Sequence, residues 1–143
     1  MRIKLWTSTA KIPTRGSALS AGWDLYADET ITIPVGETRF VHTGITIELP
    51  ESHWAGIYAR SGLASKQGLR PANCVGVIDP DYRGEWMVAI YNDSHEPRTI
   101  SIGDRIAQFA FHANLQPIEP FEVVDDLSDT IRGEGGFGST GTN

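Results

Sequence analysis

Short apolar runs with a two-residue period, separated by turn-forming residues, dominate this chain. Ile31 and Ile33, and then Ile45, Ile47 and Leu49, alternate with polar residues as on a half-buried strand. Such runs recur at a spacing of about 8–12 residues, and Pro, Gly, Asn and Asp lie between them. The pattern predicts strands at Arg2–Trp6, Thr30–Ile33, Arg39–Val41, Ile45–Leu49, Trp54–Ala59, Val75–Ile78, Trp86–Tyr91, Thr99–Ile102 and Arg105–Phe111. Only Ser61–Gln67 favours a short helix, so we expect an all-β jelly-roll-like barrel or sandwich.

A glycine-rich segment, Arg132–Gly141, follows an acidic connector that begins with Pro117 and Pro120. Five of its ten residues are glycine, and glycine-rich backbone can bring N–H groups close to an anion. A flexible tail is the alternative, but Arg132 and Phe137 favour a nucleotide-binding arm, because a spacer needs neither. The connector could extend over about 40 Å. We therefore expect a β domain over residues 1–116, and a connector and C-terminal arm over residues 117–143.

Composition limits the classes of partner. The net charge of −6 disfavours a nucleic-acid polymer as ligand, because such binding depends on neutralising many phosphates. A single nucleotide held in a local pocket remains compatible. The sequence contains no run of 18 apolar residues, so it predicts no membrane-spanning helix. One cysteine, Cys74, cannot form an internal disulfide, and the first residues lack a secretory signal. We expect a cytoplasmic protein.

The segment Gly76–Trp86 joins two apolar strands through a polar turn. Asp79 directly follows a buried-looking run, so its carboxylate is expected at a strand end, where it could act as general base for water. The alternative is that Asp79 and Asp81 only cap the turn around Pro80. Tyr82 could offer a flat face to a sugar, or could be a half-buried strand residue.

Two further segments suit phosphate, and a third suits a metal ion. Arg60, Ser61 and Gly62 lie where a strand gives way to a possible helical turn, and Gln108 lies on a strand after a glycine turn. Asp24 is a candidate for the outer shell of a magnesium ion. The alternative for Asp24 is a turn carboxylate bonded to the backbone.

Five segments in this order closely resemble the trimeric dUTPases: Ala21–Ala27, Ala59–Leu69, Gly76–Glu85, Gly103–Gln108 and Arg132–Gly141. The resemblance implies a jelly-roll homotrimer that hydrolyses dUTP to dUMP and pyrophosphate with Mg²⁺, keeps uracil out of DNA and supplies dUMP for thymidylate synthesis. It also implies that three chains assemble each active site and that the arm comes from a neighbour.

The resemblance assigns Asp79 as the base that activates water for attack at the α-phosphorus. Tyr82 would lie against the deoxyribose and leave no room for a 2′-hydroxyl. Asp24 would order water around magnesium. The remaining implied substrate contacts fall into three groups: Asn73, Gly76, Val77 and Ile78 for uracil, Arg60, Ser61, Gly62 and Gln108 for phosphates, and Arg132, Phe137, Gly138, Ser139 and Thr140 from the arm.

Departures from the family pattern are few, namely Trp23, Trp86 and Glu134. The related dCTP deaminases carry a glutamate on the strand after the Asp79 turn, and Ala89 stands at that position here. A non-catalytic nucleotide sensor is the alternative from another class. Asp79 disfavours a non-catalytic sensor, because the candidate general base is present.

Overall fold

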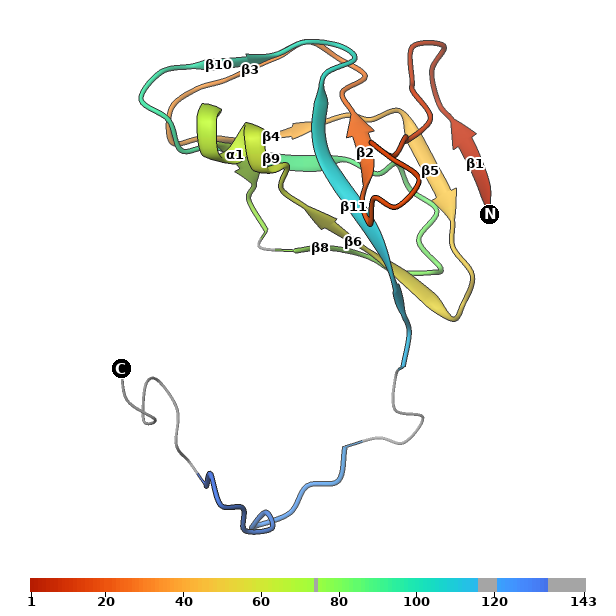
Figure 1. The fold of residues 1–143 in the computed structure, drawn as a ribbon, viewed down its shortest axis with the longest axis vertical. Helices are drawn as coiled ribbons and strands as arrows, with labels where there is room; N and C mark the ends of the chain where they lie inside the picture. Colours follow the sequence, from red (N-terminus) through yellow and green to blue (C-terminus); the bar gives the residue numbers. More distant parts are fainter. Residues whose placement is uncertain (74, 116–120, 134–143) are drawn as a thin grey trace.

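The structure is a computed structural model that describes residues 1–73, 75–115 and 121–133. It is built almost entirely of antiparallel strands (Figure 1). The elements are β1 (Arg2–Leu5), β2 (Trp23–Tyr26), β3 (Ile31–Ile33), β4 (Thr38–Val41), β5 (Ile45–Glu48), β6 (His53–Tyr58), α1 (Ser61–Gln67), β7 (Leu69–Pro71), β8 (Gly76–Ile78), β9 (Val88–Asn92), β10 (Arg98–Ile100) and β11 (Arg105–Ala113). The predicted all-β class is confirmed.

The strands form a four-stranded sheet, β2-β11-β6-β8, a three-stranded sheet, β4-β9-β7, and the pairs β1-β5 and β10-β3. Apolar side chains of the two larger sheets meet in one core. Phe109 of β11 and Ile57 of β6 come from the first, and Ile90 of β9 and Leu69 of β7 from the second. The buried Trp86 contacts Phe109 edge-on, with ring centroids 5.2 Å apart. This is the sandwich arrangement expected from alternating apolar residues.

All nine predicted strands occur, with small shifts at their ends, and α1 has the predicted bounds. The helix begins after Arg60, whose backbone is extended, and ends at Gly68 with φ of 67°. That left-handed conformation suits glycine at a helix end. Strands β2 and β7 were not predicted.

Residues 121–133 leave the β structure and run beside no strand (Figure 1). Several of their apolar side chains are almost fully exposed, including Phe121 and Val123. None of the helices in the part of the chain that the structure describes is long and apolar enough to cross a membrane. The predicted boundary between domain and arm at residue 116 remains a prediction.

Candidate active site

A cavity of about 300 Å³ lies beside the turn that connects β8 to β9. Asp79 follows β8 directly and lines this cavity, as its place at a strand end predicted. Its side chain is exposed, and within residues 1–73, 75–115 and 121–133 its carboxylate makes neither a hydrogen bond nor an ion pair. The same holds for Asp81, so the described contacts do not support the turn-capping alternative. A carboxylate in this position can accept a proton from water in the cavity.

The residues assigned to the base of the nucleotide line the same cavity: Asn73, Gly76, Val77 and Ile78. Gly76 is closely surrounded, since a Cβ there would lie 3.1 Å from both Asn73 Nδ2 and Ile57 Cβ. A side chain at position 76 would therefore narrow the cavity. Ala89 also lines it, so an apolar residue stands on this wall where a deaminase would need a carboxylate.

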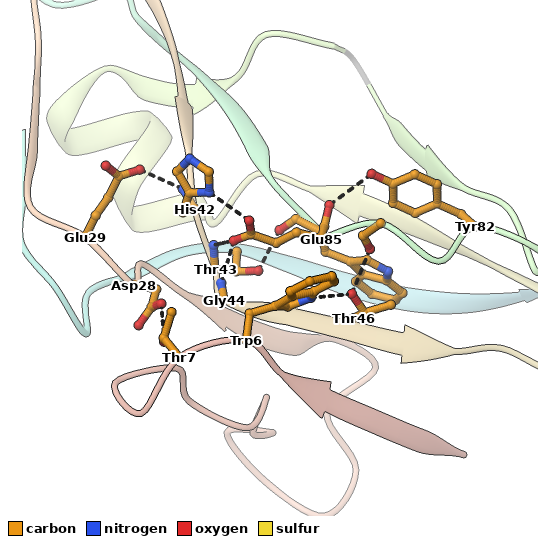
Figure 2. A network of polar contacts seen from close by, with 12 residues as sticks. Trp6, Thr7, Asp28, Glu29, His42, Thr43, Gly44, Thr46, Tyr82 and Glu85 are labelled. Atoms are coloured by element: carbon orange, nitrogen blue, oxygen red, sulfur yellow. Dashed lines mark hydrogen bonds and ion pairs between the residues drawn. The ribbon is translucent and has the colours of Figure 1, made fainter.

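Tyr82 lies at the mouth of this cavity with 42% of its surface exposed, outside any strand. Its hydroxyl donates a 3.1 Å hydrogen bond to the backbone carbonyl of Glu85 (Figure 2). A Cβ on Gly84 would lie 2.3 Å from the Tyr82 hydroxyl and 2.5 Å from its Cζ. The ring is thus held against a residue without a side chain, and the alternative of a half-buried strand residue is wrong.

A second cavity, of about 670 Å³, contains the residues assigned to phosphate. Arg60, Ser61 and Gly62 line it at the start of α1, and Gln108 lines it from β11. Gln108 is oriented by a 2.9 Å hydrogen bond from its Nε2 to the carbonyl of Ala59. At the level of sequence, only the family resemblance indicated that these residues lie near one another. In the structure, the pairing of β11 with β6 brings Gln108 close to the residues that follow β6.

Asp24 lies in the same cavity, on β2, where it is bound by two arginines. Arg60 Nε donates to its Oδ1 at 2.8 Å, and Arg105 Nη1 donates to its Oδ2 at 3.3 Å. The alternative of a turn carboxylate bonded to the backbone is wrong, because Asp24 lies on β2, which pairs with β11, and its carboxylate binds these side chains. Sequence reasoning did not identify Arg105 or Lys66 as lining residues, since an isolated cation near a turn carries no distinguishing signal.

The described residues contain no group of three or more His, Cys, Asp or Glu side chains that could hold a metal ion. Mg²⁺ commonly binds one or two carboxylates, several waters and substrate phosphates rather than an all-protein cage. A single carboxylate, Asp24, beside cations suited to phosphate fits that pattern. Both of its oxygens accept hydrogen bonds from guanidinium groups, so a direct bond to Mg²⁺ would compete with Arg60 or Arg105.

Asp79 and Arg60 lie near opposite ends of β6 in the four-stranded sheet, although the first cavity extends along β8 to the level of Ile57. In the antiparallel pairing of β6 with β8, Ala55 is opposite Ile78, so Asp79 lies level with Trp54 at the start of β6. Arg60 lies beyond the other end of β6, six residues further along. At about 3.4 Å per residue, the two side chains are attached about 20 Å apart. One chain therefore does not bring its own Asp79 to the phosphates that its own Arg60 would hold.

Glu85 is a residue of the site that sequence reasoning missed. Its carboxylate accepts hydrogen bonds from the backbone N–H groups of Thr43 (3.1 Å) and Gly44 (2.8 Å) and contacts His42 Nδ1 at 2.8 Å. The hydrogen bond with Glu85 raises the pKa of the His42 imidazole, against an opposing effect of burial. Nothing in the local sequence indicates these contacts, because they join segments about forty residues apart.

The arm is only partly described. Arg132 is exposed and lies at the end of the described residues. Phe137, Gly138, Ser139, Thr140 and Glu134 lie outside them.

Comparisons with known proteins agree over nearly the whole chain. The sequence model of the dUTPase family matches residues 8–141. The chain is 43% identical to the deoxyuridine 5′-triphosphate nucleotidohydrolase of Yarrowia lipolytica over 143 residues, covering 100% of this chain and 90% of that protein. It is 48% identical to the enzyme of the same name from Desulfitobacterium hafniense (strain DSM 10664 / DCB-2) over 136 residues, covering 93% and 89%.

Solved structures give the same result for the fold. The dUTPase of Staphylococcus bacteriophage 80alpha with dUPNHPP superposes with a TM-score of 0.86 at 27% identity, covering 99% of this chain and 98% of that one. A dUTPase from phage phi11 of S. aureus, described with a structural Mg(II) ion, has a TM-score of 0.81 at 21% identity and covers 90% and 98%.

Proposed function

Because this chain belongs to the dUTPase family and is a dUTP diphosphatase, we propose that Asp79 activates the water that attacks the α-phosphorus of dUTP. The observation that carries the proposal is the exposed Asp79 carboxylate, without a described protein partner, on the wall of the cavity that Asn73 and Tyr82 also line. A carboxylate already bonded to an arginine would be a weaker base. Asp24, by contrast, is bonded to two.

In the proposed step, Asp79 accepts a proton from water while the water oxygen forms a bond to the α-phosphorus. The bond from that phosphorus to the oxygen that bridges it to the β-phosphorus breaks. The electron pair leaves with pyrophosphate, and dUMP remains. Such phosphoryl chemistry depends mainly on placing the reactants and stabilising charge.

Arg60, Ser61, Gly62 and Gln108 supply donors for the phosphate oxygens. Of the described residues lining their cavity, Arg60, Lys66 and Arg105 are cationic and Asp24 is acidic, so the cavity favours an anion. Mg²⁺, when bound near Asp24 through water, would neutralise charge on the leaving pyrophosphate. The arm residues Arg132, Phe137, Gly138, Ser139 and Thr140 would close over the bound nucleotide and exclude bulk water.

The active site is shared between chains of a homotrimer. The separation of about 20 Å between Asp79 and Arg60 along one sheet supports this arrangement. In the proposed reaction, Asp79 acts at the α-phosphorus while Arg60 binds phosphate oxygens of the same nucleotide, so the two side chains must lie close together. One chain would contribute the cavity beside Asp79, a second the cavity around Arg60, and a third the arm. The exposed apolar side chains of residues 121–133 are consistent with a segment that contacts another chain.

Selectivity follows from the cavity beside Asp79. Asn73 and the hairpin residues Gly76, Val77 and Ile78 would read the uracil edge and reject the 5-methyl group of thymine. Tyr82 would lie against the deoxyribose and exclude a 2′-hydroxyl. In the cytoplasm such an enzyme would keep uracil out of DNA and supply dUMP for thymidylate synthesis.

The first experiment measures pyrophosphate release from dUTP, dTTP, dCTP and UTP in the presence of Mg²⁺. We expect rapid turnover of dUTP and almost none of the other three. Equal turnover of UTP would refute the role of Tyr82, and equal turnover of dTTP that of the hairpin.

A mixing experiment tests the shared site. Asp79→Asn and Arg60→Gln chains, each inactive alone, are refolded together in equal amounts. If each site takes Asp79 from one chain and Arg60 from another, random assembly restores about a quarter of the wild-type activity. Sites built within single chains would give no recovery.

A further inference from the structure

Residues 84–86, directly after the catalytic turn, are held beside residues 43–46 largely by side chains. Thr46 Oγ1 donates to the Gly84 carbonyl at 2.8 Å, and Thr43 Oγ1 donates to the Trp86 carbonyl at 2.6 Å. One backbone bond joins them, from the Trp86 N–H to the Ile45 carbonyl at 2.9 Å. The segment is therefore fixed in place although β9 begins only at Val88.

Glu85 is the central anchor of this segment (Figure 2). Its Oε1 accepts both the Thr43 and the Gly44 N–H, and its side chain is only 21% exposed. Gly44 has φ of 66°, and a Cβ there would lie 2.5 Å from Asp28 Oδ2, so this loop needs glycine to present its N–H group. Hydrogen bonds to a partly buried carboxylate are among the stronger ones in proteins.

The same segment determines where the Tyr82 ring lies. Its hydroxyl donates to the Glu85 carbonyl, and the three atoms nearest to a Cβ on Gly84 all belong to that ring. The φ angle of Gly84 is outside the left-handed region, so the backbone would accept alanine and only the ring opposes it. An alanine substitution at Gly84 therefore tests the position of the Tyr82 ring and does not strain the backbone.

We propose that Gly84 and Glu85 are positioning residues that set sugar specificity, because together they hold the Tyr82 ring where it excludes a 2′-hydroxyl. Gly84 provides the space into which the ring packs. Glu85 holds the segment through its carboxylate and the ring through its carbonyl. The inference rests on the proposed function, in which Tyr82 faces the deoxyribose.

The consequence is a division between rate and selectivity. Tyr82 N–H donates to the Asp79 carbonyl at 3.2 Å, so the base and the ring share one turn. The three heavy atoms nearest to a methyl group on Gly84 all belong to the Tyr82 ring and its hydroxyl. Such a methyl group should therefore move the ring and leave the base in place. Rejection of a substrate by shape is sensitive to small displacements.

The test compares kcat/KM for dUTP and UTP in four variants. For Gly84→Ala we expect the ratio of dUTP to UTP to fall about tenfold, while kcat for dUTP stays within about threefold of wild type. Tyr82→Phe removes one hydrogen bond but keeps the ring, and the ratio should fall by about two- to tenfold. Glu85→Ala should also lower the ratio. Glu85→Gln should restore part of it, because its amide oxygen still accepts the two N–H groups.

Glu37→Gln is the matched control, since Glu37 is an exposed carboxylate paired with Arg39 away from both cavities, and its ratio should equal that of wild type. The inference is overturned if folded Gly84→Ala keeps the wild-type ratio, whether or not Glu85→Ala folds. It is also overturned if Gly84→Ala lowers turnover of dUTP and UTP equally. Failure of the proposed function looks different, because wild-type enzyme itself would then turn over UTP as fast as dUTP.

Discussion

The contact between Asp24 and Arg60 should set the orientation of Arg60, the arginine that we propose binds the phosphates, and the energy of this contact can be estimated. Arg60 Nε lies 2.8 Å from Asp24 Oδ1, with the two side chains 26% and 13% exposed. Exposed ion pairs contribute up to about 1 kcal/mol, and hydrogen bonds to charged groups about 1.5–3 kcal/mol. A pair that is mostly buried should fall between these ranges, so we expect a coupling energy of about 1–2 kcal/mol.

Arg105 provides an internal comparison on the same carboxylate. Its Nη1 lies 3.3 Å from Asp24 Oδ2, and its side chain is 51% exposed. Longer contact and greater exposure predict a coupling below about 0.5 kcal/mol. The two arginines thus differ in geometry while they share one partner.

The assay is a pair of double-mutant cycles on the free energy of unfolding. Asp24→Asn is combined with Arg60→Gln in one cycle and with Arg105→Gln in the other, and urea unfolding is followed at one fixed protein concentration. Asp24→Asn should also raise KM for dUTP about tenfold, because Arg60 is no longer held toward the phosphates. Equal couplings for both arginines, or none for Arg60, would refute the idea that Asp24 orients Arg60.

Four further predictions test other parts of the molecule. Asp79→Asn should lower kcat by about 10²–10⁴-fold while dUTP still binds, and near-normal turnover would remove Asp79 as the base. Chelation of Mg²⁺ should abolish pyrophosphate release without changing the circular dichroism spectrum, and unaltered activity would exclude the ion from the reaction. Deletion of residues 132–143 should lower activity severely while light scattering still shows a trimer; full activity would make the segment a simple tail. His42→Gln should reduce the pH dependence of Tm. Because the partners Glu85, Glu29 and Asp28 raise the His42 pKa in the fold, its stabilisation is complete below about pH 6.5 and is lost as pH rises through the raised value. An identical fall of Tm from pH 6 to pH 8 in wild type and variant would contradict this.

The alternation of apolar residues was sufficient to predict most of the strands. Ile31 with Ile33, and Ile45 with Ile47, occur on strands as expected, and the residues before Gly68 form the expected helix. The sequence pattern did not predict strand β2, because β2 carries the charged Asp24 and has only one fully buried residue, Leu25. Its existence depends on pairing with β11, about eighty residues away.

Strand β7 was not predicted from the sequence for a different reason. It has three residues and ends in Pro71, and proline lowers the expectation of a strand. β7 is an edge strand of its sheet, where proline is tolerated. Trp86, predicted to start the next strand, instead precedes β9 and joins Ile45 by a single backbone bond.

The candidate site was predictable where its residues are close in sequence. Asp79 at the end of β8, and Arg60 to Gly62 at the start of α1, follow from local pattern. The contacts of Glu85 with Thr43 and of Asp24 with Arg105 do not, because strand register sets them. The separation of Asp79 from Arg60 along β6 also depends on register, which the sequence pattern leaves open.

That separation bears on how such an enzyme becomes active after synthesis. If Asp79 and the phosphate-binding residues around Arg60 come together only at contacts between subunits, a newly synthesised chain is inactive until it assembles with other copies. Onset of activity would then depend steeply on the amount of protein made, and extreme dilution would switch it off. In a trimer of that kind, a single faulty subunit that lacked both groups would inactivate two of the three sites.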